Sequence, residues 1–106
     1  PAGAGASPPV KVVIPASSTR TIQELDASVY RAIKWVVTIT NPILGIHKTM
    51  ELLVLNRNTF CSHVVYGVIG DPIHYLIDAQ IINNKITLLI TNFETVDLVV
   101  DAIRIG

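Results

Sequence analysis

The alternation of apolar and polar side chains is clearest over residues 30–40. The even-numbered positions of this stretch include Lys34, Thr38 and Thr40, whereas the odd-numbered ones are Arg31, Ile33, Trp35, Val37 and Ile39. A period of two residues is typical of a β-strand with one face in the core. We therefore expect a strand here, with Ile33, Trp35, Val37 and Ile39 buried. Asn41-Pro42 should end it, because proline cannot donate a hydrogen bond to a neighbouring strand.

Seven further stretches have the length and composition of strands and are separated by turn signals. They are residues 10–14, 19–25, 48–55, 60–69, 74–82, 85–91 and 96–105. The loop Asn83-Asn84 suits a two-residue hairpin turn that needs positive φ. About eight strands joined by short loops predict an all-β fold, an antiparallel, jelly-roll-like β-sandwich. We expect residues 1–18 to form an extended N-terminal arm with the first short strand, and residues 19–106 to form the sandwich.

Composition supports the all-β prediction and raises the question of a partner. Val, Ile and Thr make up 37 of the 106 residues, and these β-branched side chains favour strands. Only 15% of the residues are charged and the net charge is zero, whereas soluble domains average about 25% charged residues. A nucleic-acid-binding protein or a polybasic membrane contact would need a basic excess, so neither is expected.

Two segments are apolar on both faces of their predicted strands, residues 52–55 and 64–65. An antiparallel sheet usually presents one polar face to water. Either these segments are central strands of a compact sandwich, or their second face is covered by another subunit. The low charge favours the second interpretation, which implies a homo-oligomer.

The N-terminal segment differs from the rest of the chain. It contains Pro1, Ala2, Gly3, Ala4, Gly5, Ala6, Ser7, Pro8 and Pro9, none of them charged or large and apolar. Such a segment cannot bury enough surface to offset its ordering entropy of about 1–2 kcal/mol per residue. We expect an arm that is flexible alone or becomes ordered against a neighbouring chain, and we take these nine residues as candidate partner contacts.

A search for chemistry gives no catalytic, cofactor-binding or metal-ligating candidate. His47, His63 and His74 lack metal-ligand spacing, and Cys61 has no second cysteine with which to form a disulfide or a zinc site. Cys61 and His63 share a strand face, but without an electropositive setting we expect Cys61 to be a small packed residue. No phosphate-binding loop or nucleophile elbow is present, and no apolar run is long enough for a transmembrane helix. We expect a protein that is not an enzyme and has no cofactor, assembled in a reducing cytoplasm.

Arg31 is the exception on the apolar face of its strand. An unpaired buried charge is costly. We therefore expect Arg31 to lie near the strand end, or to pair with Asp26, Glu51 or a carboxylate of another subunit.

Five segments in order resemble small β-sandwich domains of tailed-bacteriophage virion proteins. They are residues 27–37 (ASVYRAIKWVV), 50–58 (MELLVLNRN), 63–69 (HVVYGVI), 75–92 and 99–105 (VVDAIRI). The resemblance covers roughly residues 19–105. It departs from the usual pattern at residues 41–47, which are more apolar, at the turn 56–58, which lacks glycine, and at residues 1–18, which have no counterpart.

The resemblance implies a structural role in a virion assembled in the host cytoplasm. A free-standing chain with an arm fits a capsid decoration, or cement, protein best, and such proteins commonly form trimers that bind the major capsid protein or another virion protein. The alternative is a tail, baseplate or fibre module. A module of that kind could bind a receptor or glycan through the aromatic side chains Tyr30, Tyr66, Tyr75 and Phe93.

Overall fold

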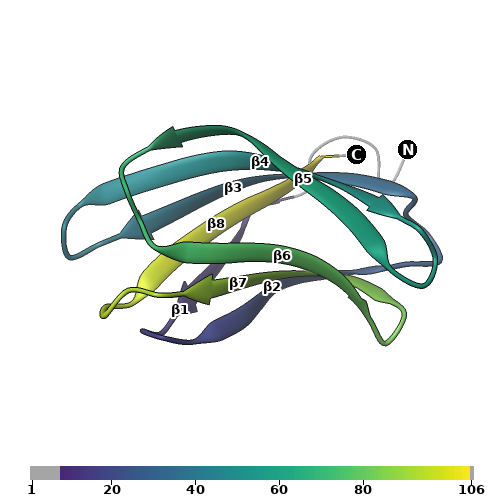
Figure 1. The fold of residues 1–106 in the computed structure, drawn as a ribbon, viewed down its shortest axis with the longest axis horizontal. Coiled ribbons are helices and arrows are strands. Elements are labelled where there is room, and N and C mark those ends of the chain that lie inside the picture. The colour runs from purple at the N-terminus through teal and green to yellow at the C-terminus, as the bar shows by residue number, and fades with distance from the viewer. Residues whose placement is uncertain (1–7, 106) are drawn as a thin grey trace.

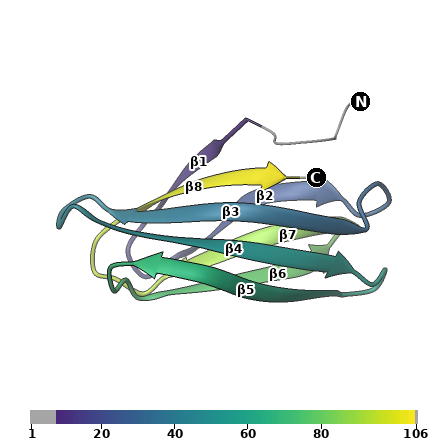
Figure 2. The ribbon, with the colours of Figure 1, turned by 90° about the horizontal axis from the view of Figure 1, so that it is seen from above.

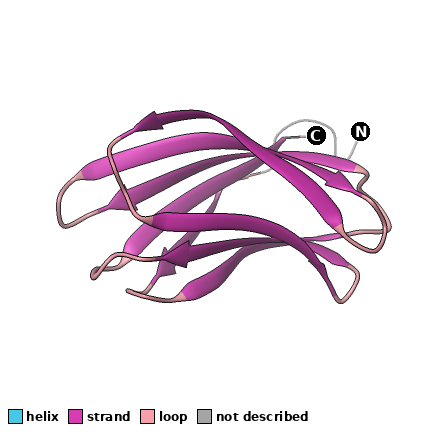
Figure 3. Ribbon diagram, in the orientation of Figure 1, coloured by secondary structure: helices cyan, strands magenta, loops and turns pink. Residues whose placement is uncertain are grey.

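The computed structural model describes residues 8–105, which form eight strands and no helix (Figures 1 and 3). The strands are β1 (Val10–Ile14), β2 (Thr19–Asp26), β3 (Ala32–Asn41), β4 (Ile46–Asn56), β5 (Cys61–Gly70), β6 (Tyr75–Ile82), β7 (Lys85–Asn92) and β8 (Leu98–Ile105). They build two antiparallel sheets packed face to face, so the predicted all-β sandwich is confirmed.

The two sheets have five and three strands. Their orders are β1-β8-β3-β4-β5 and β2-β7-β6 (Figures 1 and 2). β1 pairs with β8, and β2 pairs with β7, so strands from the two ends of the chain are neighbours in both sheets, as in a jelly roll. The hairpin of β4 and β5 extends the larger sheet, so β1 and β5 are its edges and β3 is its centre.

The core lies between the sheets and is built from alternate positions of each strand. On β3 the side chains of Ile33, Trp35, Val37 and Ile39 are at most 1% exposed, which are the positions that the alternation assigns to the core. Burial of each such side chain stabilises the fold by about 1.5–3 kcal/mol. The indole Nε1 of Trp35 donates to Gln23 Oε1 at 2.7 Å, so its one polar atom is paired across the sandwich.

Buried asparagines at strand ends hold the connections between the sheets. Asn92 Nδ2 lies 3.0, 3.2 and 2.8 Å from the carbonyl oxygens of Ile14, Pro15 and Val96. Its Oδ1 accepts the backbone N–H of Glu94 at 2.7 Å. One side chain thus ties the β1–β2 connection to the β7–β8 connection, and Asn56 joins the β2–β3 connection to β4 in the same manner.

Arg31 precedes β3 rather than lying within it. The N–H groups of Val29 and Tyr30 both donate to Asp26 O, so the turn after β2 extends to Tyr30 and β3 begins at Ala32, two residues later than the alternation indicated. The placement of Arg31 on the core face was therefore wrong, whereas its expected position near the strand end is correct.

The partners of Arg31 also differ from the predicted carboxylates. Its side chain is exposed, and Nη1 donates to Asn56 O at 2.9 Å and to Asn58 Oδ1 at 3.3 Å. Asp26 instead accepts from Ser28, and Glu51 pairs with Lys34. Carbonyl oxygens of the β4–β5 turn thus take the place that carboxylates were expected to fill.

Positive φ angles mark two local features. Asn83 and Asn84 have φ of 51° and 60°, as the predicted two-residue hairpin requires. Gly67 has φ of 62° and lies in a β-bulge, where the register shifts between the pairs Glu51–Tyr66 and Thr49–Ile69. The bulge divides β5 into a regular first part, from Cys61 to Tyr66, and a shorter second part.

Candidate functional site

The most unusual surface of the described residues is the solvent-facing side of the five-stranded sheet, which we call the outer face. Strand register places side chains from all five strands on it. Its exposed large apolar members are Val13, Leu53, Leu55, Val64, Tyr66, Ile69 and Ile105, and Val36, Val99 and Ile103 are half-buried among them. An exposed apolar patch of this kind usually marks an interaction site.

The charged side chains of the outer face are paired with one another. Lys34 Nζ lies 2.8 Å from Glu51 Oε1 at the centre of the sheet, and Lys11 Nζ lies 3.6 Å from Asp101 Oδ1 near the β1 edge. The hydrogen bond and the charge of the Glu51 carboxylate raise the pKa of Lys34. The four charges therefore cancel within the face, which lowers the cost of covering it.

The hydroxyl groups on this face are also paired. Thr38 Oγ1 and Thr49 Oγ1 lie 3.1 Å apart, and Thr49 Oγ1 also donates to Val37 O at 3.0 Å. Thr40 Oγ1 lies 2.9 Å from His47 Nδ1. Because these groups bond within the sheet, they can lose water at a smaller cost than unpaired hydroxyls would.

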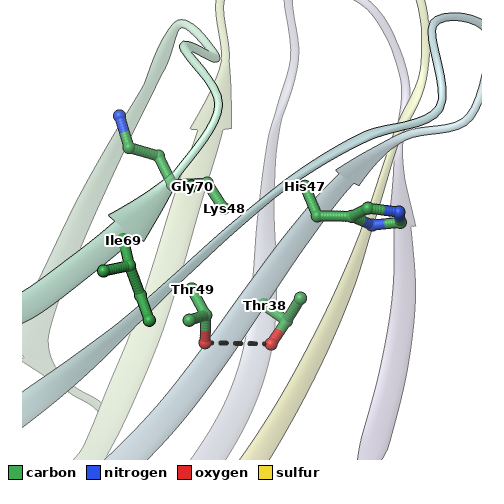
Figure 4. Close-up of a pocket in the computed structure, with 6 residues that line it drawn as sticks. All are labelled: Thr38, His47, Lys48, Thr49, Ile69 and Gly70. Carbon is green, nitrogen blue, oxygen red and sulfur yellow. Dashed lines mark hydrogen bonds between the residues drawn. The ribbon is translucent and has the colours of Figure 1, made fainter.

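Two shallow depressions lie along β4 and β5. The larger, about 410 Å³, is lined by Thr38, His47, Lys48, Thr49, Ile69 and Gly70 (Figure 4). The smaller, about 220 Å³, is lined by Leu53, Leu55, Ser62, His63 and Val64. Both are open to solvent, whereas a small-molecule site encloses most of its ligand. They are better suited to side chains of a neighbouring protein than to a substrate.

The β5 edge carries no Asp, Glu, Lys or Arg over its ten residues, Cys61–Gly70. The other edge strands each carry at least one such side chain: Lys11 on β1, Arg20 on β2 and Asp78 on β6. Edge strands of monomeric proteins usually bear charges that prevent pairing with another chain. The bulge at Gly67 protects only the second part of β5, so the first part is an unprotected edge.

Cys61 and His63 come close to Asp78 of β6, a grouping that the sequence alone did not show. His63 Nδ1 lies 3.8 Å from Asp78 Oδ1, and the Cys61 thiol donates to Ala79 O at 3.1 Å. Burial first, and the charge of Asp78 second, raise the pKa of the Cys61 thiol. A raised pKa disfavours the thiolate that a nucleophile needs, so the arrangement suits the expected packed residue and not catalysis.

The histidines are dispersed. His47 lies on the outer face, His63 faces β6, and His74 precedes β6, with its backbone N–H donating to Glu94 Oε2 at 2.7 Å. Within residues 8–105, no three His, Cys, Asp or Glu side chains are grouped so that they could hold a metal ion.

The four aromatic side chains considered for glycan binding are dispersed over the described residues. Tyr30 packs beside the Arg104 guanidinium at 5.1 Å, and Tyr66 lies on the outer face with Lys34 Nζ 6.0 Å from its ring centroid. Tyr75 is the first residue of β6 and is paired with Asn92, whereas Phe93 follows β7 and its N–H donates to His74 O at 3.1 Å. The aromatic side chains therefore do not form one shared platform.

The candidate partner contacts fall mostly outside the described residues. Pro1 to Ser7 lie outside them, whereas Pro8 and Pro9 are described and exposed. They lead directly into β1, an edge of the five-stranded sheet. The arm therefore joins the fold beside the outer face.

The comparisons with protein families and with curated proteins find no relative of this chain. No model of a protein family matches the chain, and no curated protein matches it. Among residues 8–105 there is also no helix of the length and apolarity needed to cross a membrane.

Proposed function

We propose that this chain is a structural subunit of a virion, a capsid decoration protein that works by covering surface and not by catalysis. The observation that carries the proposal is the outer face. Several of its large apolar side chains are exposed, its charges cancel in two ion pairs within the face, and its threonine hydroxyls form hydrogen bonds within the sheet. A surface with these properties is stabilised by contact with another protein surface.

The self-association part of the proposal follows from energetics. Covering apolar surface contributes about 25 cal/mol per Å², and a stable interface buries roughly 1,200–2,000 Å². The outer face spans five strands and extends to the β5 edge, so it offers a broad contact to further copies of the chain or to a major capsid protein. Threefold symmetry is what the phage resemblance implies for such a subunit.

The virion part of the proposal is supported by the order of the five resembling segments over residues 19–105. In the structure four of these segments supply parts of β3, β4, β5 and β8, the strands of the outer face other than β1, and the fifth supplies the β6–β7 hairpin of the smaller sheet. Four of the five resembling segments therefore also contribute to the surface to be covered. The exposed Pro8 and Pro9 lead directly into β1, an edge of that same sheet.

A pair of matched variants tests whether the outer face mediates association. Ile103→Lys places a charge at the centre of the outer face, next to Val36, whereas Leu76→Lys places one on the exposed side of β6 in the other sheet. We expect light scattering after size exclusion to show the same oligomer for the wild type and for Leu76→Lys, and a smaller assembly of the 11.5 kDa chain for Ile103→Lys. Equal masses for the two variants would contradict the role of this face.

Localisation tests the virion assignment separately. Antibodies raised against the folded chain should label intact particles purified from cells that express the gene, as seen by electron microscopy. Particles that carry none of the chain by labelling and by mass spectrometry would refute the assignment, even if the protein oligomerises.

A further inference from the structure

We propose that two copies of this chain pair antiparallel through β5 around a twofold axis, so that their five-stranded sheets become one continuous sheet. The inference rests on the proposal that the chain self-associates, and it adds a twofold contact at the β5 edge to the threefold symmetry that the phage resemblance implies. It concerns one edge of the sheet, whereas the proposed function concerns the whole outer face, and the two can fail independently.

The chemistry of the β5 edge favours such pairing. A strand at the edge of a sheet leaves every second N–H and C=O group without a neighbouring strand. From Cys61 to Tyr66 the strand has no Asp, Glu, Lys, Arg or proline and no bulge, and its one histidine, His63, faces Asp78 of β6. Pairing would satisfy these backbone groups, as in peptide recognition by strand addition.

The same segment is complementary to itself. Antiparallel pairing places directly opposed side chains on the same face. With the twofold axis at Val64, Val64 faces its own copy, and Ser62 faces Tyr66 of the other chain. All three positions belong to the outer face, so the apolar surface continues across the seam. A twofold contact needs this self-complementarity, because each chain offers the same patch.

Opposite charges flank the two ends of β5. Arg57, in the turn before β5, lies at one end, where its Nε donates to Ser62 Oγ at 2.8 Å and its guanidinium lies 5.9 Å from the Phe60 ring centroid. Arg31 is hydrogen-bonded to the same turn. Asp71 lies directly after β5 at the other end. Lys48 is also near that end, but its ammonium lies over the Tyr75 ring of β6, 5.5 Å from the centroid. Antiparallel pairing brings the Arg57 end of each chain beside the Asp71 end of the other, twice per dimer.

The smaller depression, of about 220 Å³, could be filled by a side chain of the second copy. Its lining includes Ser62 and Val64 of β5 together with Leu53 and Leu55 of β4. In the proposed register Tyr66 of the second chain stands opposite Ser62, and its ring can enter this depression. A rigid aromatic side chain in an apolar pocket is commonly the centre of a stable protein–protein interface.

Charge reversal gives a direct test. Arg57→Asp and Asp71→Arg each set like charges against one another at both ends of the proposed dimer. We expect either variant alone to self-associate at least roughly tenfold more weakly than the wild type in sedimentation velocity. An equimolar mixture of the two should regain the wild-type association. In the mixed dimer the two introduced charges, which are opposite in sign, face each other at one end, and the native Arg57 and Asp71 face each other at the other end.

The mixture excludes a purely structural effect. Within one chain Arg57 and Asp71 lie at opposite ends of a ten-residue strand, so a loss of folding would not be repaired by adding the other variant. Matched controls are Arg20→Asp on β2, and Asp97→Arg, since Asp97 accepts a backbone N–H from Ala16 much as Asp71 accepts one from His47. Unchanged association in both single variants, or no recovery in the mixture, would overturn the proposal.

A second measurement does not depend on how the variants fold. Amide hydrogen exchange of the wild type should show protection that rises with protein concentration at alternate residues between Cys61 and Tyr66. Amide exchange between Cys61 and Tyr66 that is independent of concentration, while the protein oligomerises, would also overturn the β5 pairing.

If Ile103→Lys reduces association and the β5 charge reversals leave association unchanged, the outer-face proposal stands and the β5 pairing falls. The opposite pattern would retain the pairing alone, and a wild type that stays monomeric would refute both.

Discussion

Asn92 provides the sharpest test of how the sandwich is held together. Its side chain is completely buried at the end of β7 and bonds to groups from both connections at that end of the molecule. Asn92→Ala removes the amide and leaves the carbonyl oxygens of Ile14 and Val96, and the N–H of Glu94, without this partner. The backbone bond from Asn92 N to Ser18 O remains possible.

The magnitude follows from the number of bonds lost. The amide nitrogen has two hydrogens, so two of its three carbonyl contacts are satisfied at a time, and Oδ1 accepts a third bond. A net contribution of about 1 kcal/mol per bond gives a loss of about 3 kcal/mol. A domain of this size has only about 5–15 kcal/mol in total, so we expect a large fall in stability.

The assay can use the single tryptophan. Trp35 is fully buried, so urea unfolding can be followed by its fluorescence at one fixed protein concentration. The matched control is Gln80→Ala, which removes an exposed amide with one hydrogen bond, to Asp78, and should cost less than about 0.5 kcal/mol. If Asn92→Ala cost less than about 1 kcal/mol, the buried amide would not be what joins the two connections.

Two further predictions concern a glycine and the cysteine. Gly70→Ala should destabilise the fold by about 3 kcal/mol or more, because φ is +127° and the new Cβ would overlap the His47 carbonyl oxygen. The control Gly45→Ala, with φ of +66° and no atom within 4 Å of its Cβ, should cost about 1–2 kcal/mol in the same urea assay. Equal costs of the two substitutions would contradict the close approach of β4 and β5 at Gly70. Cys61 should react with iodoacetamide at pH 8 more slowly than a free cysteine, because the pKa of its thiol is raised. Asp78→Asn should speed this reaction, because it removes a negative charge that raises the pKa of the thiol. A slower or unchanged rate in Asp78→Asn would show that the charge of Asp78 does not act on the thiol.

The strands could be predicted because their signals are local. Alternation over residues 30–40 located the core side chains of β3, and Asn83-Asn84 located the β6–β7 hairpin with its positive φ angles. The start of β3 could not be found in this way. Arg31 breaks the alternation, but the sequence does not show the turn that excludes Tyr30 and Arg31 from β3, because that turn depends on hydrogen bonds to Asp26 O.

The candidate surface could be predicted only in part. The apolar segments 52–55 and 64–65 indicated that a second face needed cover, and both belong to β4 and β5 of the outer face. That Lys34 neutralises Glu51, and Lys11 neutralises Asp101, depends on strand register, which brings together residues far apart in the sequence. Asn92 resembled an ordinary turn residue, because nothing in the sequence shows that its amide is buried.

The most direct test of the central claim is the mass of the wild-type protein by sedimentation equilibrium over a range of concentrations. Since the outer face is apolar and internally neutral, we predict that the mass rises with concentration from 11.5 kDa to a defined multiple of it. A constant mass of 11.5 kDa up to the highest concentration reached would contradict the claim that further copies of the chain cover this face.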